Sequence, residues 1–86
     1  METRVAVISI IVEENDGTAN ASVGTINDLL HEYGNYIIGR MGIPYHAKNV
    51  SIISVALDAP QDAISALSGK LGRLHGVSVK TMYTNC

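Results

Sequence analysis

Two segments of this 86-residue chain carry branched apolar side chains at both odd and even positions. Residues 4–13 read RVAVISIIVE, and residues 49–57 read NVSIISVAL. Valine and isoleucine favour extended backbone, and successive side chains of a strand point to opposite faces of its sheet. Both segments are therefore predicted to be strands that are apolar on both faces.

A different period follows each of these segments. From about residue 18, apolar side chains recur at the spacing of one helix face, at Ile26, Leu29, Leu30 and Tyr33. The same spacing returns after Pro60, at Ile64, Leu67, Leu71 and Leu74. Gly34-Asn35 and Gly76 are suited to end the two helices, because glycine and asparagine tolerate the left-handed conformation common at helix C-termini. Two amphipathic helices are therefore predicted.

Two weaker strands complete the chain. Residues 36–43 are interrupted by Gly39 and Gly42 and run into Pro44, whereas residues 77–84 alternate between two faces. The order β-α-β-β-α-β predicts a single α+β domain over residues 1–86, a ferredoxin-like sandwich with two helices on one face of a four-stranded antiparallel sheet. The two strongly apolar strands should lie in the centre and the two weaker ones at the edges.

Two helices can cover only one face of such a sheet. The other face would leave β-branched side chains in water, at a cost of about 25 cal/mol per Å² of apolar surface. We therefore expect a homodimer or tetramer assembled through the sheet, although a sheet that tolerates scattered exposed apolar residues is the alternative. The residues predicted for this interface are Ile8, Ile11, Ile53 and Val55.

Composition excludes several other functions of this architecture. Six basic and eight acidic residues give a formal charge of −2, which disfavours direct binding of nucleic acid. RNA-recognition sheets stack bases on aromatic side chains, but this chain has no Phe or Trp, and its four tyrosines lie outside the two apolar strands. The single cysteine, Cys86, fits a reducing cytoplasm. The longest apolar run, residues 5–12, is far shorter than the roughly 20 residues that span a bilayer.

No group of side chains predicts a reaction. The serines lack the histidine and acidic partners of a nucleophilic site, so we expect no enzymatic activity and no cofactor. His31, His46 and His75 lie on a helix, in a turn and at a helix end, without ligand spacing. A metal-responsive domain that shares His46, His75 or Cys86 between subunits is the alternative function.

Two regions are candidates for binding a small ligand. Arg40 lies among glycines in the second strand, where it is suited to bind an anion, although protection of the sheet edge would also explain a charge there. Acidic residues follow the first strand before a glycine, in a loop that is suited to contact a ligand. The predicted ligand residues are Glu13, Asp16, Gly17, Arg40 and Gly42.

Residues 26–53, INDLLHEYGNYIIGRMGIPYHAKNVSII, and residues 66–81, ALSGKLGRLHGVSVKT, resemble a known family. It is the family of small stand-alone iron-only hydrogenase system regulators, and the similarity covers about residues 4–80. The resemblance implies an ACT-like ferredoxin fold similar to the C-terminal domain of nickel-responsive transcriptional regulators. Such domains assemble through their sheets and often bind small effectors at subunit boundaries.

The chain departs from the nickel-responsive regulators in two respects. It has no N-terminal DNA-binding segment and no His-x-His strand followed by a nearby cysteine. Direct DNA binding and nickel sensing are therefore not expected. The resemblance implies a regulatory or accessory oligomer, linked to the maturation or expression of the iron-only hydrogenase, with a small molecule or another protein as its partner.

Overall fold

The computed structural model describes residues 2–13 and 19–84. Its elements follow the predicted order, with two short 3₁₀ helices, η1 and η2, on either side of the second strand. Their bounds are β1 Arg4–Glu13, α1 Ala19–Glu32, η1 Gly34–Tyr36, β2 Ile37–Tyr45, η2 His46–Lys48, β3 Val50–Ala59, α2 Gln61–Gly72 and β4 Val77–Tyr83.

The four strands form one antiparallel sheet in the order β2-β3-β1-β4, which confirms the predicted α+β fold. The two strongly apolar strands, β1 and β3, lie in the centre and pair along their full lengths, from Arg4 opposite Ala59 to Glu13 opposite Val50. β2 and β4 are the edges. β2 extends two residues beyond the predicted end and contains Pro44, which an edge strand tolerates because its outer side needs no donor.

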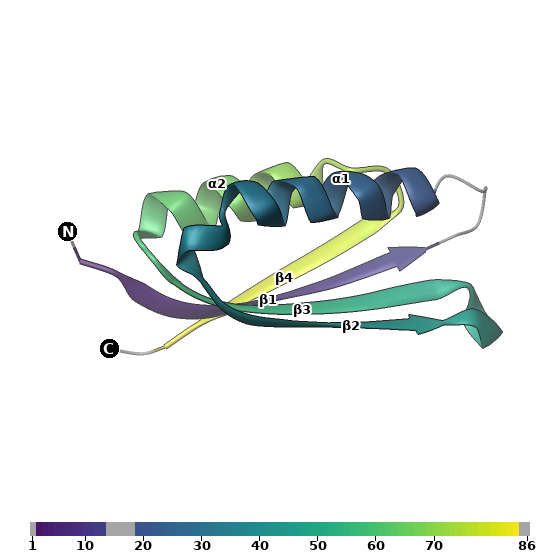
Figure 1. Ribbon diagram of the computed structural model, residues 1–86, viewed down its shortest axis with the longest axis horizontal. Coiled ribbons are helices and arrows are strands. Elements are labelled where there is room, and N and C mark those ends of the chain that lie inside the picture. The colour runs from purple at the N-terminus through teal and green to yellow at the C-terminus, as the bar shows by residue number, and fades with distance from the viewer. Residues whose placement is uncertain (1, 14–18, 85–86) are drawn as a thin grey trace.

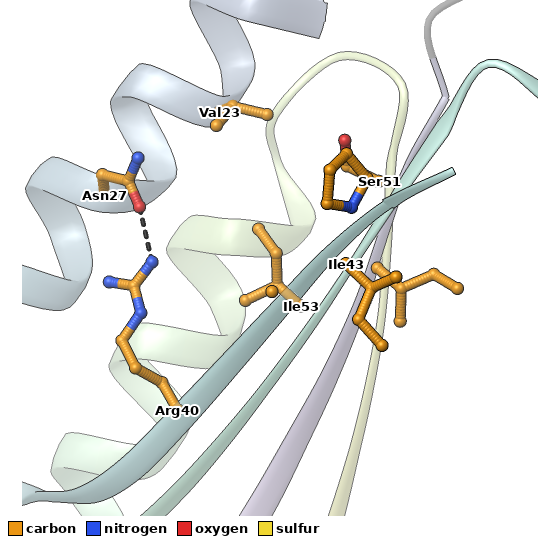
Figure 2. Close-up of a pocket in the computed structure, with 9 residues that line it drawn as sticks. Val23, Asn27, Arg40, Ile43, Ser51 and Ile53 are labelled. Atoms are coloured by element: carbon orange, nitrogen blue, oxygen red, sulfur yellow. Dashed lines mark hydrogen bonds between the residues drawn. The ribbon is translucent and has the colours of Figure 1, made fainter. Parts of the chain in front are cut away.

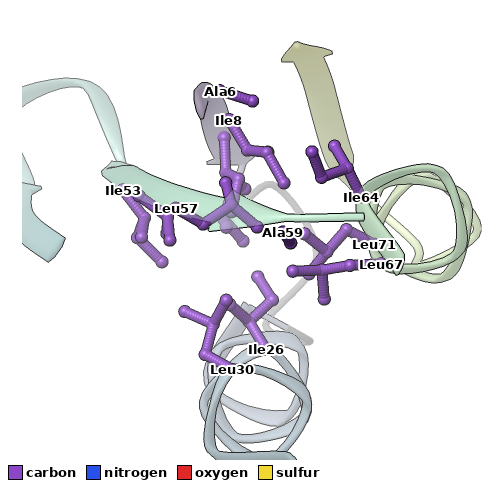
Figure 3. Close-up of a cluster of buried hydrophobic side chains, with 13 residues drawn as sticks. Ala6, Ile8, Ile26, Leu30, Ile53, Leu57, Ala59, Ile64, Leu67 and Leu71 are labelled. Carbon is purple, nitrogen blue, oxygen red and sulfur yellow. The ribbon is translucent and has the colours of Figure 1, made fainter. Parts of the chain in front are cut away.

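Both helices lie on the same face of the sheet, as Figure 1 shows. The core lies between these two layers, where side chains from β1 and β3 meet those from the helices (Figure 3). Among the described residues, thirteen buried apolar side chains form it: Ala6, Ile8, Ile10, Val12, Ile26, Leu30, Ile53, Val55, Leu57, Ala59, Ile64, Leu67 and Leu71. Alternate positions of each central strand supply this core, as the period of two requires.

The connection from α2 to β4 depends on one glycine. Gly76 has a φ of +73°, and a Cβ there would lie 3.0 Å from the Glu13 carbonyl oxygen. The Glu13 amide donates a hydrogen bond to the Gly76 carbonyl at 2.8 Å, which ties the end of β1 to the start of β4. Gly76 is therefore required both for its left-handed backbone and for this close approach.

The helices themselves are short. α1 has 14 residues and α2 has 12. Within the described residues, no helix combines the length and the apolar character that crossing a membrane requires.

Candidate functional site

β2 is the strand that the helices leave uncovered. α1 packs chiefly on β1, and α2 packs on β4 and β1. Every residue of β2 after Ile37 is exposed. Its side that faces the helix layer carries Arg40, Gly42 and Pro44, as the pairing of these residues with Val55, Ile53 and Ser51 shows. These residues do not fill the space beside α1, because Gly42 has no side chain and Pro44 has a short one.

A cavity of about 260 Å³ therefore opens between α1 and the edge strand. Figure 2 shows Arg40 and Ile53 pointing from the sheet toward α1, where Asn27 and Val23 face them, while Ile43 lies on the other side of the β2 ribbon. The lining residues are Val23, Asn27, Arg40, Gly42, Ile43, Pro44, Ser51, Ile52 and Ile53. The cavity is small compared with a typical pocket for a drug-sized ligand, which holds about 300–1,000 Å³.

At the polar end of this cavity, the positively charged Arg40 side chain is paired with the uncharged Asn27 side chain. The Arg40 Nη2 atom donates a hydrogen bond to Asn27 Oδ1 at 2.6 Å. Among the residues that the structure describes, the Arg40 side chain forms no ion pair, and Asn27 is its one hydrogen-bonding partner. A guanidinium has five N–H donors in a planar fork, so most of its hydrogen-bonding capacity faces solvent. The arrangement is suited to receive an anion.

The structure brings together part of the predicted ligand site. Arg40 and Gly42 both line the cavity. Glu13 does not line it, since it lies at the end of β1 beside Gly76. Asp16 and Gly17 lie outside the described residues. Sequence reasoning missed Asn27 and Val23, although their spacing of four residues on α1, beside the apolar stripe that contains Ile26 and Leu30, is the signal that they share a helix face.

The second candidate site is the sheet face opposite the helices, called the open face below. Strand alternation and the cross-strand pairs assign eight large apolar side chains to it: Val5, Val7, Ile11, Met41, Ile43, Tyr45, Ile52 and Met82. Their exposed fractions range from 38% for Val7 to 74% for Met82. They make up eight of the ten large apolar side chains exposed in the described part of the chain. The predicted two-sided apolar character of the sheet is therefore confirmed.

The residues predicted for the interface need correction. Ile8, Ile53 and Val55 are buried on the helix-covered face, with exposed fractions of 0%, 5% and 0%. Ile11 alone of the four lies on the open face. Ile8 and Ile11 are three positions apart, an odd offset, so their side chains point to opposite faces, and Ile8 pairs with Val55 on the covered one.

Small and charged residues complete the open face. Ser9 pairs with Ser54 at its centre, and Ala56 lies two residues further along β3, so the side chains in the middle of the face are short. Lys80 of β4 and Asp58 of β3 also project on this side, one toward an edge and the other toward an end. Among the described residues, Tyr45 is the one aromatic side chain on this surface, so the face has no row of rings on which bases could stack.

The histidines do not converge on a metal site. His31 lies at the end of α1, His46 in η2 and His75 after α2. In the regions 2–13 and 19–84, no group of three or more histidine, cysteine, aspartate or glutamate side chains could hold a metal ion. Cys86 lies outside these regions. The main-chain carbonyl of His75 accepts a hydrogen bond from the Ser22 hydroxyl at 3.1 Å, which joins α1 to the segment after α2.

Lys70 links α2 to Tyr33, the residue that follows α1. Its Nζ atom donates a hydrogen bond to the Tyr33 hydroxyl at 3.1 Å and lies 5.2 Å from the centre of that ring. This hydrogen bond, with the charges of Tyr33 and Glu32, raises the pKa of Lys70 above its ordinary value. Lys70 is therefore engaged in linking α2 to the end of α1.

Comparison with solved structures identifies the fold. The chain is similar to the ACT domain of the GTP pyrophosphokinase of Chlorobium tepidum, with a TM-score of 0.74 and 17% identity over 93% of this chain and 99% of that one. It is also similar to a formyltetrahydrofolate deformylase from Pseudomonas putida, with a TM-score of 0.65 and 15% identity. This match covers 95% of this chain but 29% of that one. The fold is that of an ACT-like domain, as predicted.

A more similar structure and a family match place the chain more narrowly. The uncharacterized protein TM1266 from Thermotoga maritima superimposes with a TM-score of 0.87 and 37% identity, over 98% of this chain and 100% of that one. Residues 4–81 match the TM1266-like family, which is described as "Iron-only hydrogenase system regulator, putative". No curated protein matches the chain significantly. The chain belongs to the TM1266-like family of iron-only hydrogenase system regulators, which confirms the family predicted from residues 26–53 and 66–81.

Proposed function

We propose that this chain is a regulatory domain of the iron-only hydrogenase system that catalyses no reaction and works as a homo-oligomer, responding to a small ligand or a protein partner. Membership in a family of regulators supports the biological role. The observation that carries the oligomer is the open face, where eight large apolar side chains share one side of the sheet.

The size of the open face is of the same order as the area that a second copy would cover. Four strands about 4.8 Å apart, each about eight residues long at about 3.3 Å per residue, span on the order of 500 Å² in projection. Protruding side chains add to the accessible area, and a stable interface buries about 800 Å² per partner. A two-fold pairing of this face with itself would bury apolar side chains from both copies against one another.

Charge and cysteine content support a cytoplasmic protein that acts on other proteins or small molecules. The net charge of −2 disfavours direct contact with nucleic acid. The single cysteine agrees with a reducing compartment. The site for a small ligand is the cavity that contains Arg40 and Gly42.

The test uses Ile11→Lys, which places a charge among the apolar side chains of the open face and replaces no residue of the cavity lining. We expect the wild type to sediment as a dimer or tetramer at low micromolar concentration and Ile11→Lys as a monomer, because an unpaired charge buried in an interface costs about 3 kcal/mol or more. Ala66→Lys is the matched control, since it adds the same charge on an exposed position of α2. It should assemble as the wild type does.

The same variants connect assembly to the biological role. In cells that lack the gene, we expect the wild type and Ala66→Lys to restore the normal level of iron-only hydrogenase activity and Ile11→Lys to fail. Hydrogenase activity that does not respond to deletion of the gene would contradict the role. A monomeric wild type would contradict assembly through the open face.

A further inference from the structure

The cavity between α1 and β2 has two chemically different ends. Arg40 and Asn27 form a polar end, and their hydrogen bond of 2.6 Å holds the guanidinium over the opening. Branched aliphatic side chains, among them Val23, Ile52 and Ile53, form most of the rest of the lining, together with Gly42, Pro44 and the hydroxyl-bearing Ser51. A ligand that fits must therefore carry a compact apolar group within a few bonds of an anion.

The cavity stays open because Gly42 has no side chain to fill it. A Cβ at Gly42 would meet nothing within 4 Å, and Gly42 does not have the positive φ that would itself require glycine. A larger residue would therefore fit the backbone at this position and project into the cavity. Arg40 has no acidic partner among the described residues, so it could pair with a ligand without first breaking an ion pair.

We infer that this cavity binds a small monocarboxylate with a branched aliphatic end, whose carboxylate pairs with Arg40. The planar guanidinium matches the two oxygens of a carboxylate, and the Asn27 amide group lies beside it. Arg40 is the one cationic side chain in the cavity lining, and the chain has a net charge of −2. A monoanion therefore suits the site better than a phosphate, which carries more charge. A volume of about 260 Å³ limits the ligand to a small molecule.

The cavity also shares residues with the open face. Ile43 and Ile52 line the cavity and belong to the open face. A second copy on that face would cover these two side chains and thereby close one side of the cavity. Binding of the carboxylate and assembly would then favour each other by the same factor, as linkage requires. This inference rests on the proposed function, because it names the site and the ligand class through which the oligomer would be regulated.

The probe is isovalerate, a branched carboxylate, titrated into isotopically labelled protein and followed by amide chemical shifts. We expect saturable shifts centred on residues 23–27 and 40–44. Isovaleramide has the same shape without the charge, and acetate has the charge without the branched end, so both should bind at least about tenfold more weakly. Equal binding of isovaleramide, or tighter binding of inorganic phosphate, would overturn the ligand class.

Variants of the chain test the location. Arg40→Gln should weaken isovalerate binding at least about tenfold, because a hydrogen-bonded charge pair is lost, and Arg73→Gln, the same change at an exposed position outside the cavity, should not. Gly42→Val should fill the cavity and abolish the shifts, with an unchanged fold reported by the core amides. Unchanged binding to Arg40→Gln or Gly42→Val would overturn the site.

Binding and assembly can fail separately. Val7→Lys adds a charge to the open face beside Ala56 and Met82, which lie outside the cavity lining, so it should block assembly without touching the cavity. It should bind isovalerate at least about fivefold more weakly than the assembled wild type. Equal affinity would overturn the coupling. Arg40-dependent shifts in a wild type that proves monomeric would refute the proposed assembly and leave the binding site standing, whereas an oligomer without such shifts would refute the binding site alone.

Discussion

The two edge strands of this sheet occupy equivalent positions and have opposite environments. β4 alternates between half-buried and exposed residues along its whole length, because α2 lies over it. β2 is exposed at every residue after Ile37, on both of its faces. One edge of the sheet is thus held by the fold of the single chain, and the other is available for contacts that the chain does not make by itself.

Residue types agree with this difference. The positions of β4 that face the helix layer are Val77, Val79, Thr81 and Tyr83, which can pack under α2. The corresponding positions of β2 include Arg40, Gly42 and Pro44, none of which supplies a large apolar group. β2 instead places Met41, Ile43 and Tyr45 on the open face. Met41, Ile43 and Tyr45 thus point away from the helices, where a partner could reach them, whereas Ile37 at the start of β2 packs against the core.

The largest effect should come from the helix that covers β4. Leu67 of α2 is fully buried, so Leu67→Ala should lower the free energy of unfolding by about 2–5 kcal/mol. Ile43→Ala in β2 should lower it by about 1 kcal/mol or less, because 46% of that side chain is already exposed. Urea denaturation of both changes in the Ile11→Lys background removes any contribution from assembly. Equal losses would mean that β2 is covered in the single chain.

Assembly should depend more on β2 than on β4. Met41→Lys should raise the dissociation constant of the oligomer by an amount equivalent to about 2 kcal/mol, because Ile43 and Tyr45 lie near it on the open face. Met82→Lys should change that constant by less than about 1 kcal/mol, since Lys80 is its neighbour on the same side of β4 and Met82 is 74% exposed. Sedimentation equilibrium measures both. The reverse order would place the interface at the β4 edge.

Glycines at the two edges should respond with opposite signs. Gly76→Ala should destabilise the fold by about 1–2 kcal/mol, because a positive φ of +73° is strained for alanine and the new Cβ would press on the Glu13 carbonyl. Gly39→Ala in β2 should stabilise it by about 0.5–1 kcal/mol, since nothing lies within 4 Å of the new Cβ. Thermal unfolding in the Ile11→Lys background compares them. A loss of stability in both would mean that β2 is as constrained as the turn before β4.

Most of the fold could be predicted because its signals are local. The change of hydrophobic period marks α1 and α2, and the bounds of β1 were predicted without error. The central position of β1 and β3 follows from their apolar residues at both odd and even positions. The end of β2 was missed by two residues, because Pro44 is a poor signal in an edge strand, where its missing amide has no partner to lose.

The candidate sites were predicted only in part. Arg40 and Gly42 stand out in the sequence, since a charge and a glycine interrupt an apolar strand, and both line the cavity. Asn27 does not stand out, because polar residues beside the apolar stripe of a helix are ordinary. Ile8, Ile53 and Val55 were assigned to the interface but lie in the core. The error arose because a strand with apolar residues at both odd and even positions does not reveal which set faces the helices.

The sequence by itself therefore determined the order of elements, the two central strands and the presence of an apolar face beyond what two helices can cover. These properties depend on the period of side chains along a strand or a helix, which is written in the chain. Only the tertiary structure decided which face the helices cover, that α1 leaves β2 bare, and that Asn27 meets Arg40 across the opening. Those outcomes depend on where the helices lie over the sheet, and the packing of residues distant in sequence sets that position.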